Sequence, residues 1–208
     1  MFTVEDGTWA IHLARGAVAR ALGTPLAPID PTRLPAVFRE RRGVFVTWCL
    51  HPERQLRGCI GYPQPVLPLA QGVQEAAVSA ALDDPRFPPV TARELGSLVA
   101  EVSLLGPFEP VAPSDRPRGV KVGRDGLVVE LGRFHGILLP QVAPEQGWNN
   151  EELLDGTCEK AGLDRGAWRS PRVNVLRFEA EVFRELSPGG EVARASELDQ
   201  RERGTGGT

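Results

Sequence analysis

The chain has 208 residues, of which 41% are hydrophobic and 25% are charged, a composition typical of soluble globular proteins. This length is sufficient for one domain with a substantial core. The formal net charge of −3 excludes a strongly basic protein, so nothing in the charge supports nucleic-acid binding. Three cysteines are too few for a disulfide framework in a chain of this size.

The sequence contains no recognisable targeting or membrane segment. The N-terminal residues lack a basic region followed by an apolar block, which a secretory signal would require. No apolar run approaches the ~18 residues of a membrane-spanning helix. We therefore expect a cytoplasmic protein with no membrane partner.

The first elements along the chain are a helix and a hairpin. Trp9, Leu13 and Ala17 have helical spacing, and we expect Thr8 to be the N-cap of that helix. The proline-rich segment 23–33 is expected to be irregular. β-Branched and aromatic residues then predict three consecutive elements, namely a strand over 44–50, a turn over 51–55 and a second strand over 56–62.

The rest of the chain alternates helices with strands. A helix over 67–82 is expected to end before Pro85, because the residue before a proline avoids helical geometry. The later elements are expected in this order: a strand over 98–105, a hairpin of 127–131 and 136–139, a loop over 140–147, a helix over 151–161 capped by Asn149 or Asn150, and a long strand over 174–186. This pattern predicts an α+β fold with a mainly antiparallel sheet and flanking helices.

The C-terminal segment differs in composition from the rest of the chain. Residues 187–208 are polar, lack aromatic residues and finish in glycine and threonine. We therefore expect one folded domain over 1–186 and a disordered tail over 187–208, with at most a frayed helix within it.

The strand over 56–62, LRGCIGY, carries the residues of greatest chemical interest. Side chains alternate along a strand, so Arg57 and Cys59 are expected on one face. If the turn pairs Leu50 with Leu56, Cys49 is opposite Arg57 and Thr47 is opposite Cys59. That face of the hairpin then carries four residues: Thr47, Cys49, Arg57 and Cys59. A guanidinium near a thiol favours the reactive thiolate, so Cys59 and Arg57 are the candidate catalytic residues.

The same residues also allow a structural interpretation. Gly58 and Gly61 could let a ligand approach the backbone, which makes them candidate ligand-binding residues. Alternatively, Cys59 could be packed in the core, Arg57 could pair with a carboxylate, and the glycines could allow a helix to contact the sheet. The residues alone leave both interpretations open.

Motifs for common cofactors and catalytic machinery are missing from the sequence. It contains no GxxxxGK[ST], HExxH, GxSxG or paired CxxC, and its three histidines are far apart in the chain. We therefore predict no metal site and name no cofactor.

Five motifs, in order, resemble those of one protein family. They are LRGCIGYPQP (56–65), ALDDPRFPPV (81–90) with the segment that follows it, GILLPQVAPEQGW (136–148), ELLDGTCEKAGL (152–163) and FEAEVF (178–183). Together they cover most of residues 8–186, and they are similar to the AMMECR domain family.

The resemblance implies an α+β fold in which two unequal subdomains form one compact unit. Proteins of this family have no firmly assigned reaction, and in bacteria and archaea they are often encoded beside, or fused to, Memo-like and radical SAM proteins. The resemblance therefore implies an enzyme or enzyme component in a shared modification pathway, centred on Arg57–Gly61. The alternative is a non-catalytic binding or adaptor module that uses the same surface.

Three further residues are candidates for ligand binding. Asp84 and Arg86 of the DDPRF segment could form a charged cluster near the thiol, although we favour a structural role in which the aspartate organises the turn and the arginine is ion-paired. Gln141 belongs to a proline-bearing loop that could line a pocket.

Overall fold

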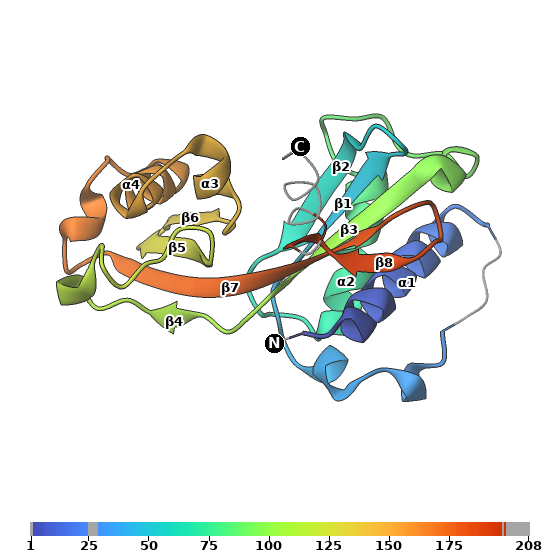
Figure 1. Ribbon diagram of the computed structural model, residues 1–208, viewed down its shortest axis with the longest axis horizontal. Coiled ribbons are helices and arrows are strands. Elements are labelled where there is room, and N and C mark those ends of the chain that lie inside the picture. Colours follow the sequence, from blue (N-terminus) through green and yellow to red (C-terminus); the bar gives the residue numbers. More distant parts are fainter. Residues whose placement is uncertain (1, 25–28, 197, 199–208) are drawn as a thin grey trace, which may run out of the picture. The chain divides into compact units, whose positions relative to one another are not determined.

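The computed structural model describes residues 2–24, 29–196 and 198, and it divides into two units (Figure 1). Unit 1 consists of residues 1–104 and 181–208, and unit 2 of residues 105–180. Strands pair in antiparallel fashion within both units and helices accompany them, which confirms the predicted α+β class.

Unit 1 is a sheet with two helices on one of its faces. Its helices are α1 (Val4–Ala21) and α2 (Leu69–Leu82), and the sheet order is β2 (Gln55–Tyr62), β1 (Val44–Leu50), β3 (Leu98–Leu105) and the C-terminal part of β7 (Asn174–Glu185). β8 (Val192–Arg194) pairs with β7. Three 3₁₀ helices, η1 (Pro31–Arg33), η2 (Ala36–Arg39) and η3 (Glu94–Ser97), lie in the connections.

The core of unit 1 lies between its helices and the sheet. α2 packs against β1 and β2, and α1 packs against α2. Alternate residues of β1, namely Val44, Val46 and Trp48, are fully buried in this core. The indole nitrogen of Trp48 donates a hydrogen bond to the carbonyl oxygen of Ala77 in α2, at 3.0 Å. Because side chains alternate along a strand, Thr47 and Cys49 face the opposite side of the sheet.

α1 begins five residues earlier than the sequence pattern predicted. Its N-cap is Thr3, which forms a reciprocal capping box with Asp6. Thr8, the expected N-cap, lies inside the helix and donates its hydroxyl to the carbonyl of Val4. The prediction was wrong because the capping box satisfies two free N–H groups at the earlier position.

Unit 2 is a smaller sheet covered by a helix. Its elements are β4 (Glu109–Pro110), η4 (Pro113–Asp115), β5 (Asp125–Leu131), β6 (Phe134–Leu138), α3 (Val142–Gln146), α4 (Asn150–Lys160) and η5 (Ala167–Arg169). The N-terminal part of β7 pairs with β5 on one side and β4 on the other. α4 packs on β5 and β6, and Asn149 caps it.

Two segments contain elements that the sequence analysis did not predict. α3 lies in the expected loop over 140–147, because Pro144 falls in its first turn, where proline is tolerated. β8 lies in the expected tail. A turn at Gly189 and Gly190 returns the chain to β7, and the side chain of Val192 is buried. The disorder expected for residues 199–208 concerns positions outside the described residues.

Candidate functional site

The β1–β2 hairpin has the predicted register near Cys59 but not at Arg57. Thr47 is the partner of Cys59, as predicted, and Trp48 is the partner of Gly58. The register then shifts between Trp48 and Cys49, so Cys49 is opposite Leu56. The predicted pairing of Cys49 with Arg57 is therefore wrong, because a β-bulge leaves Arg57 as the extra residue of β2.

The Cys59 thiol is half-buried and accepts a hydrogen bond. The hydroxyl of Thr47 donates to the sulfur at 3.2 Å. The backbone N–H of Cys59 donates to Oδ2 of Asp84 at 2.9 Å, and its carbonyl accepts from Nη2 of Arg86 at 3.2 Å. β2 is an edge strand of its unit, so these two side chains occupy backbone groups that a neighbouring strand would otherwise bind.

Asp84 connects the loop after α2 to the hairpin. Its carboxylate is buried and also accepts from the backbone N–H and the guanidinium of Arg86, the latter at 2.9 and 2.7 Å. The Arg86 guanidinium, followed by the N–H groups of Cys59 and Arg86, holds the pKa of this carboxyl well below its usual range. Asp84 therefore organises the turn, and its lone pairs are used within the protein.

Arg57 contacts an acid that the sequence analysis did not name. Its Nε and Nη2 donate to the two carboxylate oxygens of Glu94, at 2.6 and 3.2 Å. The guanidinium carbon lies 5.9 Å from the ring centroid of Phe87, and Nη1 has no hydrogen-bond partner among the described residues. Arg57 is 8% exposed. Its charge is thus engaged by Glu94, and Arg86 is the arginine that contacts Cys59.

The glycines of β2 make room for other parts of unit 1. A Cβ on Gly58 would lie 1.9 Å from the carbonyl oxygen of Ala80 in α2. A Cβ on Gly61 would lie 2.2 Å from the ring of Phe45. Real Cβ atoms do not approach so closely, so glycine is needed at both positions for the observed packing.

A further acid, which the sequence analysis did not name, lies on the neighbouring strand in line with Thr47 and Cys59. Glu101 of β3 is the partner of Thr47 on the other side of β1. Its Oε2 accepts from Arg54 at 3.2 Å and from Arg184 at 2.6 Å. The signal was present, because Glu101 is the one charged residue in the apolar strand LVAEVSLL. We call Thr47, Cys49, Cys59 and Glu101 the thiol face.

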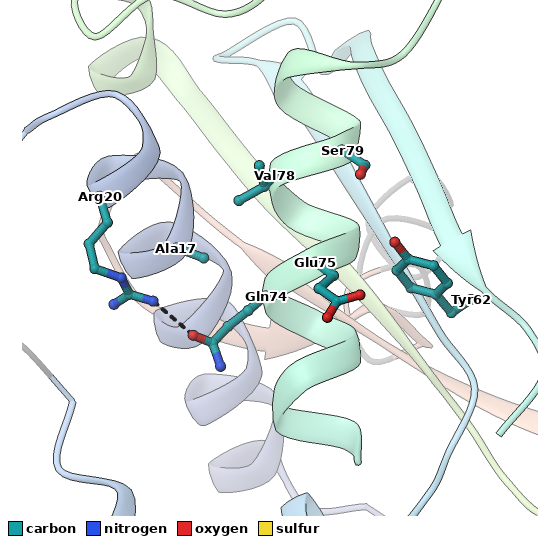
Figure 2. Close-up of a pocket in the computed structure, with 7 residues that line it drawn as sticks. All are labelled: Ala17, Arg20, Tyr62, Gln74, Glu75, Val78 and Ser79. Atoms are coloured by element: carbon teal, nitrogen blue, oxygen red, sulfur yellow. Dashed lines mark hydrogen bonds between the residues drawn. The ribbon is translucent and has the colours of Figure 1, made fainter. Parts of the chain in front are cut away.

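A groove of about 450 Å³ lies over α1, α2 and the end of β2 (Figure 2). It is lined by Ala17, Arg20, Tyr62, Gln74, Glu75, Val78 and Ser79. Arg20 donates to the side chain of Gln74 across the two helices, at 2.7 Å. Tyr62 packs against the core of unit 1 and is thus on the helix side of β2, opposite to Cys59.

Gln141, the last candidate residue, belongs to unit 2. It is the N-cap residue of α3, its side chain makes no capping hydrogen bond, and it is half-buried. The described residues include no group of three or more His, Cys, Asp or Glu side chains arranged to hold a metal ion. Within the same part of the chain, no helix combines the length and apolar character needed to cross a bilayer.

The contacts of Asp84 lead to an expected pH dependence of stability. The folded-state pKa of Asp84 is lower than its ordinary value of 3.8, so ionised Asp84 stabilises the fold above about pH 5. This contribution decreases as the pH falls below about 4, towards the folded-state pKa. The Asp84→Asn variant is expected to lose about 1–3 kcal/mol of unfolding free energy at pH 7, because an amide cannot accept from all of the partly buried donors that the carboxylate binds. The loss should be smaller at pH 3, where part of the contribution of the ionised carboxylate is already absent.

Urea unfolding at about pH 7, 5 and 3 measures this difference. The matched control is Asp83→Asn, since Asp83 is exposed and adjacent in sequence. If Asp84→Asn destabilised the fold equally at all three pH values, the ionised carboxylate would not be the source of the effect.

These features define an α+β protein whose edge hairpin presents a hydrogen-bonded thiol. The chain belongs to the AMMECR1 family, since the family model matches residues 11–183, and this confirms the family that the motifs indicated. Protein MJ0810 of Methanocaldococcus jannaschii is 46% identical over 92% of this chain and 96% of its own length. A protein of Thermofilum pendens is 47% identical over 91% of this chain and 94% of its own length.

A solved structure has the same fold. The crystal structure of the uncharacterized protein PH0010 from Pyrococcus horikoshii superposes with a TM-score of 0.79 at 46% identity. It covers 91% of this chain and 96% of its own chain. The similarity therefore extends through both units, and the residues that the family model matches include the β1–β2 hairpin.

Proposed function

We propose that the chain is an enzyme component whose reactive group is the Cys59 thiol, in a modification pathway shared with Memo-like and radical SAM proteins. The observation that supports this most directly is the Thr47–Cys59 contact, in which a hydroxyl donates to a half-buried sulfur. A donor to sulfur stabilises negative charge there, and the thiolate is the nucleophilic form of cysteine.

The surroundings of Cys59 also suit a positioned nucleophile. Asp84 binds the backbone N–H of Cys59 and Arg86 binds its carbonyl, so the sulfur has a defined position relative to Thr47. Cys49 and Cys158 differ from it, since they are 7% and 0% exposed and burial raises the pKa of each thiol. The role of Arg57 in this proposal is to position β2 through Glu94, rather than to contact the sulfur.

Alkylation of the native chain by iodoacetamide tests the proposed function. We expect Cys59 to react at least tenfold faster than Cys49 and Cys158 near neutral pH. Thr47→Val should slow this reaction about three- to tenfold, because one hydrogen bond contributes about 0.5–1.5 kcal/mol. Thr47→Ser keeps the hydroxyl and should restore most of the rate.

Peptide mapping by mass spectrometry gives the rate for each cysteine. If Cys59 were alkylated only in denaturant, the thiol would be a packed structural group and the proposal would be wrong. If Thr47→Val were alkylated as fast as the unmodified chain, the Thr47–Cys59 hydrogen bond would not be the cause of the reactivity of Cys59.

A second candidate function is a binding or adaptor module. The observation in favour of it is the exposure of Arg86. Its side chain is 53% exposed beside β2, and its Nη1 donates no hydrogen bond to any residue that the structure describes. An exposed arginine of this kind suits a partner with acidic groups. If the chain is an adaptor, Arg86→Ala should weaken its capture of a purified Memo-like protein, and Cys59→Ser should leave that capture unchanged. An enzyme component should lose its activity with Cys59→Ser.

A further inference from the structure

The thiol face contains a second cysteine close to the proposed reactive thiol. Cys59 of β2 is opposite Thr47 of β1, and Cys49 is two residues after Thr47 in β1. β1 pairs with β3 without interruption through both positions, so Thr47 and Cys49 are on one face of the sheet. Cys49 and Cys59 are therefore diagonal neighbours across the hairpin. All three cysteines are free in the structure.

We propose that Cys49 is a resolving thiol that forms a reversible disulfide with Cys59 when a hydroperoxide oxidises the chain. This inference rests on the proposed function, since it requires Cys59 to be the reactive thiol, and it adds a means of regulation. The two side chains lie on the same face of the sheet, because Cys59 is opposite Thr47 and Cys49 is two positions from Thr47 along β1. Cys49 itself is buried beside Glu101, so it is protected from direct attack by solvent oxidants.

The reaction balances with a hydroperoxide as the only oxidant. The Cys59 thiolate attacks the terminal oxygen of the peroxide and the O–O bond breaks. The other oxygen leaves as hydroxide from hydrogen peroxide, or as alkoxide from an organic hydroperoxide, and takes up a proton to become water or an alcohol. Cys59 is then a sulfenic acid. The Cys49 sulfur attacks the Cys59 sulfur, an S–S bond forms, and the sulfenic oxygen leaves as water with the proton of Cys49. Two electrons pass from two thiols to one peroxide.

The strand geometry makes such a bond readily reducible. Diagonal neighbours in an antiparallel pair have Cα atoms roughly 7–8 Å apart. Unstrained disulfides join Cα atoms about 4.4–6.8 Å apart. The hairpin must therefore shift slightly at the bulge next to Cys49, and strained disulfides are more easily reduced than relaxed ones. Cys59 would be blocked while the bond exists and available again after reduction by a small thiol.

Oxidation of the full chain with hydrogen peroxide, followed by alkylation and peptide mapping, tests the inference. We expect two of the three thiols to be lost, a Cys49–Cys59 crosslinked peptide to appear, and dithiothreitol to restore both thiols. The Cys49→Ser variant should instead accumulate sulfenic and sulfinic acid on Cys59, at least fivefold above the unmodified chain. Cys158→Ser is the matched control, and it should form the crosslink normally.

Three outcomes would overturn the inference: no crosslink in the oxidised chain, a crosslink between the Cys59 residues of two chains, or the same oxidation products with and without Cys49. A Cys49→Ala variant with a native circular dichroism spectrum separates loss of the thiol from loss of the fold. Failure of the two proposals is distinguishable. If reduced Cys59 resists iodoacetamide, the proposed function fails; if it reacts but no crosslink forms, only this inference fails.

Discussion

Replacement of Glu185 by alanine is expected to lower the free energy of unfolding by about 3–5 kcal/mol, the largest effect of any single substitution we consider. Glu185 is 1% exposed, and both of its carboxylate oxygens accept from Arg15. It also accepts from the backbone N–H groups of Ala100, at 2.8 Å, and Gly189, at 3.0 Å. The substitution leaves these N–H groups without their acceptor, and it leaves the guanidinium of Arg15 with only the carbonyl oxygens of Leu95 and Leu98 as acceptors.

Arg15 is the partner that makes the loss large. Its side chain is 13% exposed and lies 5.7 Å from the ring centroid of Trp48, so water cannot fully replace the missing carboxylate. Removal of one member of a buried ion pair is costly because it leaves the other charge uncompensated. The double variant Arg15→Ala/Glu185→Ala should therefore be nearly as stable as Glu185→Ala alone.

Urea unfolding followed by tryptophan fluorescence measures these differences. The control is Glu53→Ala, since Glu53 is exposed in the turn of the hairpin, and it should change stability by less than about 0.5 kcal/mol. Additive losses in the double variant would show that the two side chains stabilise unit 1 independently.

Local patterns in the sequence predicted most of the elements of the fold. Strand β3 over Leu98–Leu105 has the predicted bounds, and α2 ends before Pro85, as predicted. These patterns predict elements because apolar residues recur on the buried face, with a period of two in strands and 3.6 in helices. The N-cap of α1 was misassigned because Thr3 and Thr8 both precede helical residues. The Thr3–Asp6 capping box distinguishes them.

The candidate site was predicted in part for a related physical reason. Alternation placed Thr47 beside Cys59, and the structure confirms that pairing. It failed at Arg57 because a bulge changes the period by one residue and leaves no simple signature in the sequence. The acids that engage the arginines of unit 1 could not be paired from sequence either, since Glu94 is 37 residues from Arg57 and Glu185 is 170 residues from Arg15.

Replacement of Gly58 by alanine is expected to lower the free energy of unfolding by about 3 kcal/mol, because the new methyl group would overlap the backbone of α2. Its Cβ would lie 1.9 Å from the oxygen and 3.0 Å from the carbon of the Ala80 carbonyl. A backbone carbonyl in a helix cannot rotate away as a side chain can. Either α2 or β2 must move, and the fold loses buried contact in both cases.

The same substitution connects the packing of α2 to the chemistry of Cys59. Movement of β2 would separate the Cys59 sulfur from the Thr47 hydroxyl, now 3.2 Å apart, so alkylation should slow to the rate of Thr47→Val. Gly96→Ala is the matched control, because nothing lies within 4 Å of its added methyl group. It should leave both stability and alkylation unchanged. A Gly58→Ala variant as stable as the unmodified chain would mean that glycine is not required there for packing, and ligand approach would become the better explanation of this residue.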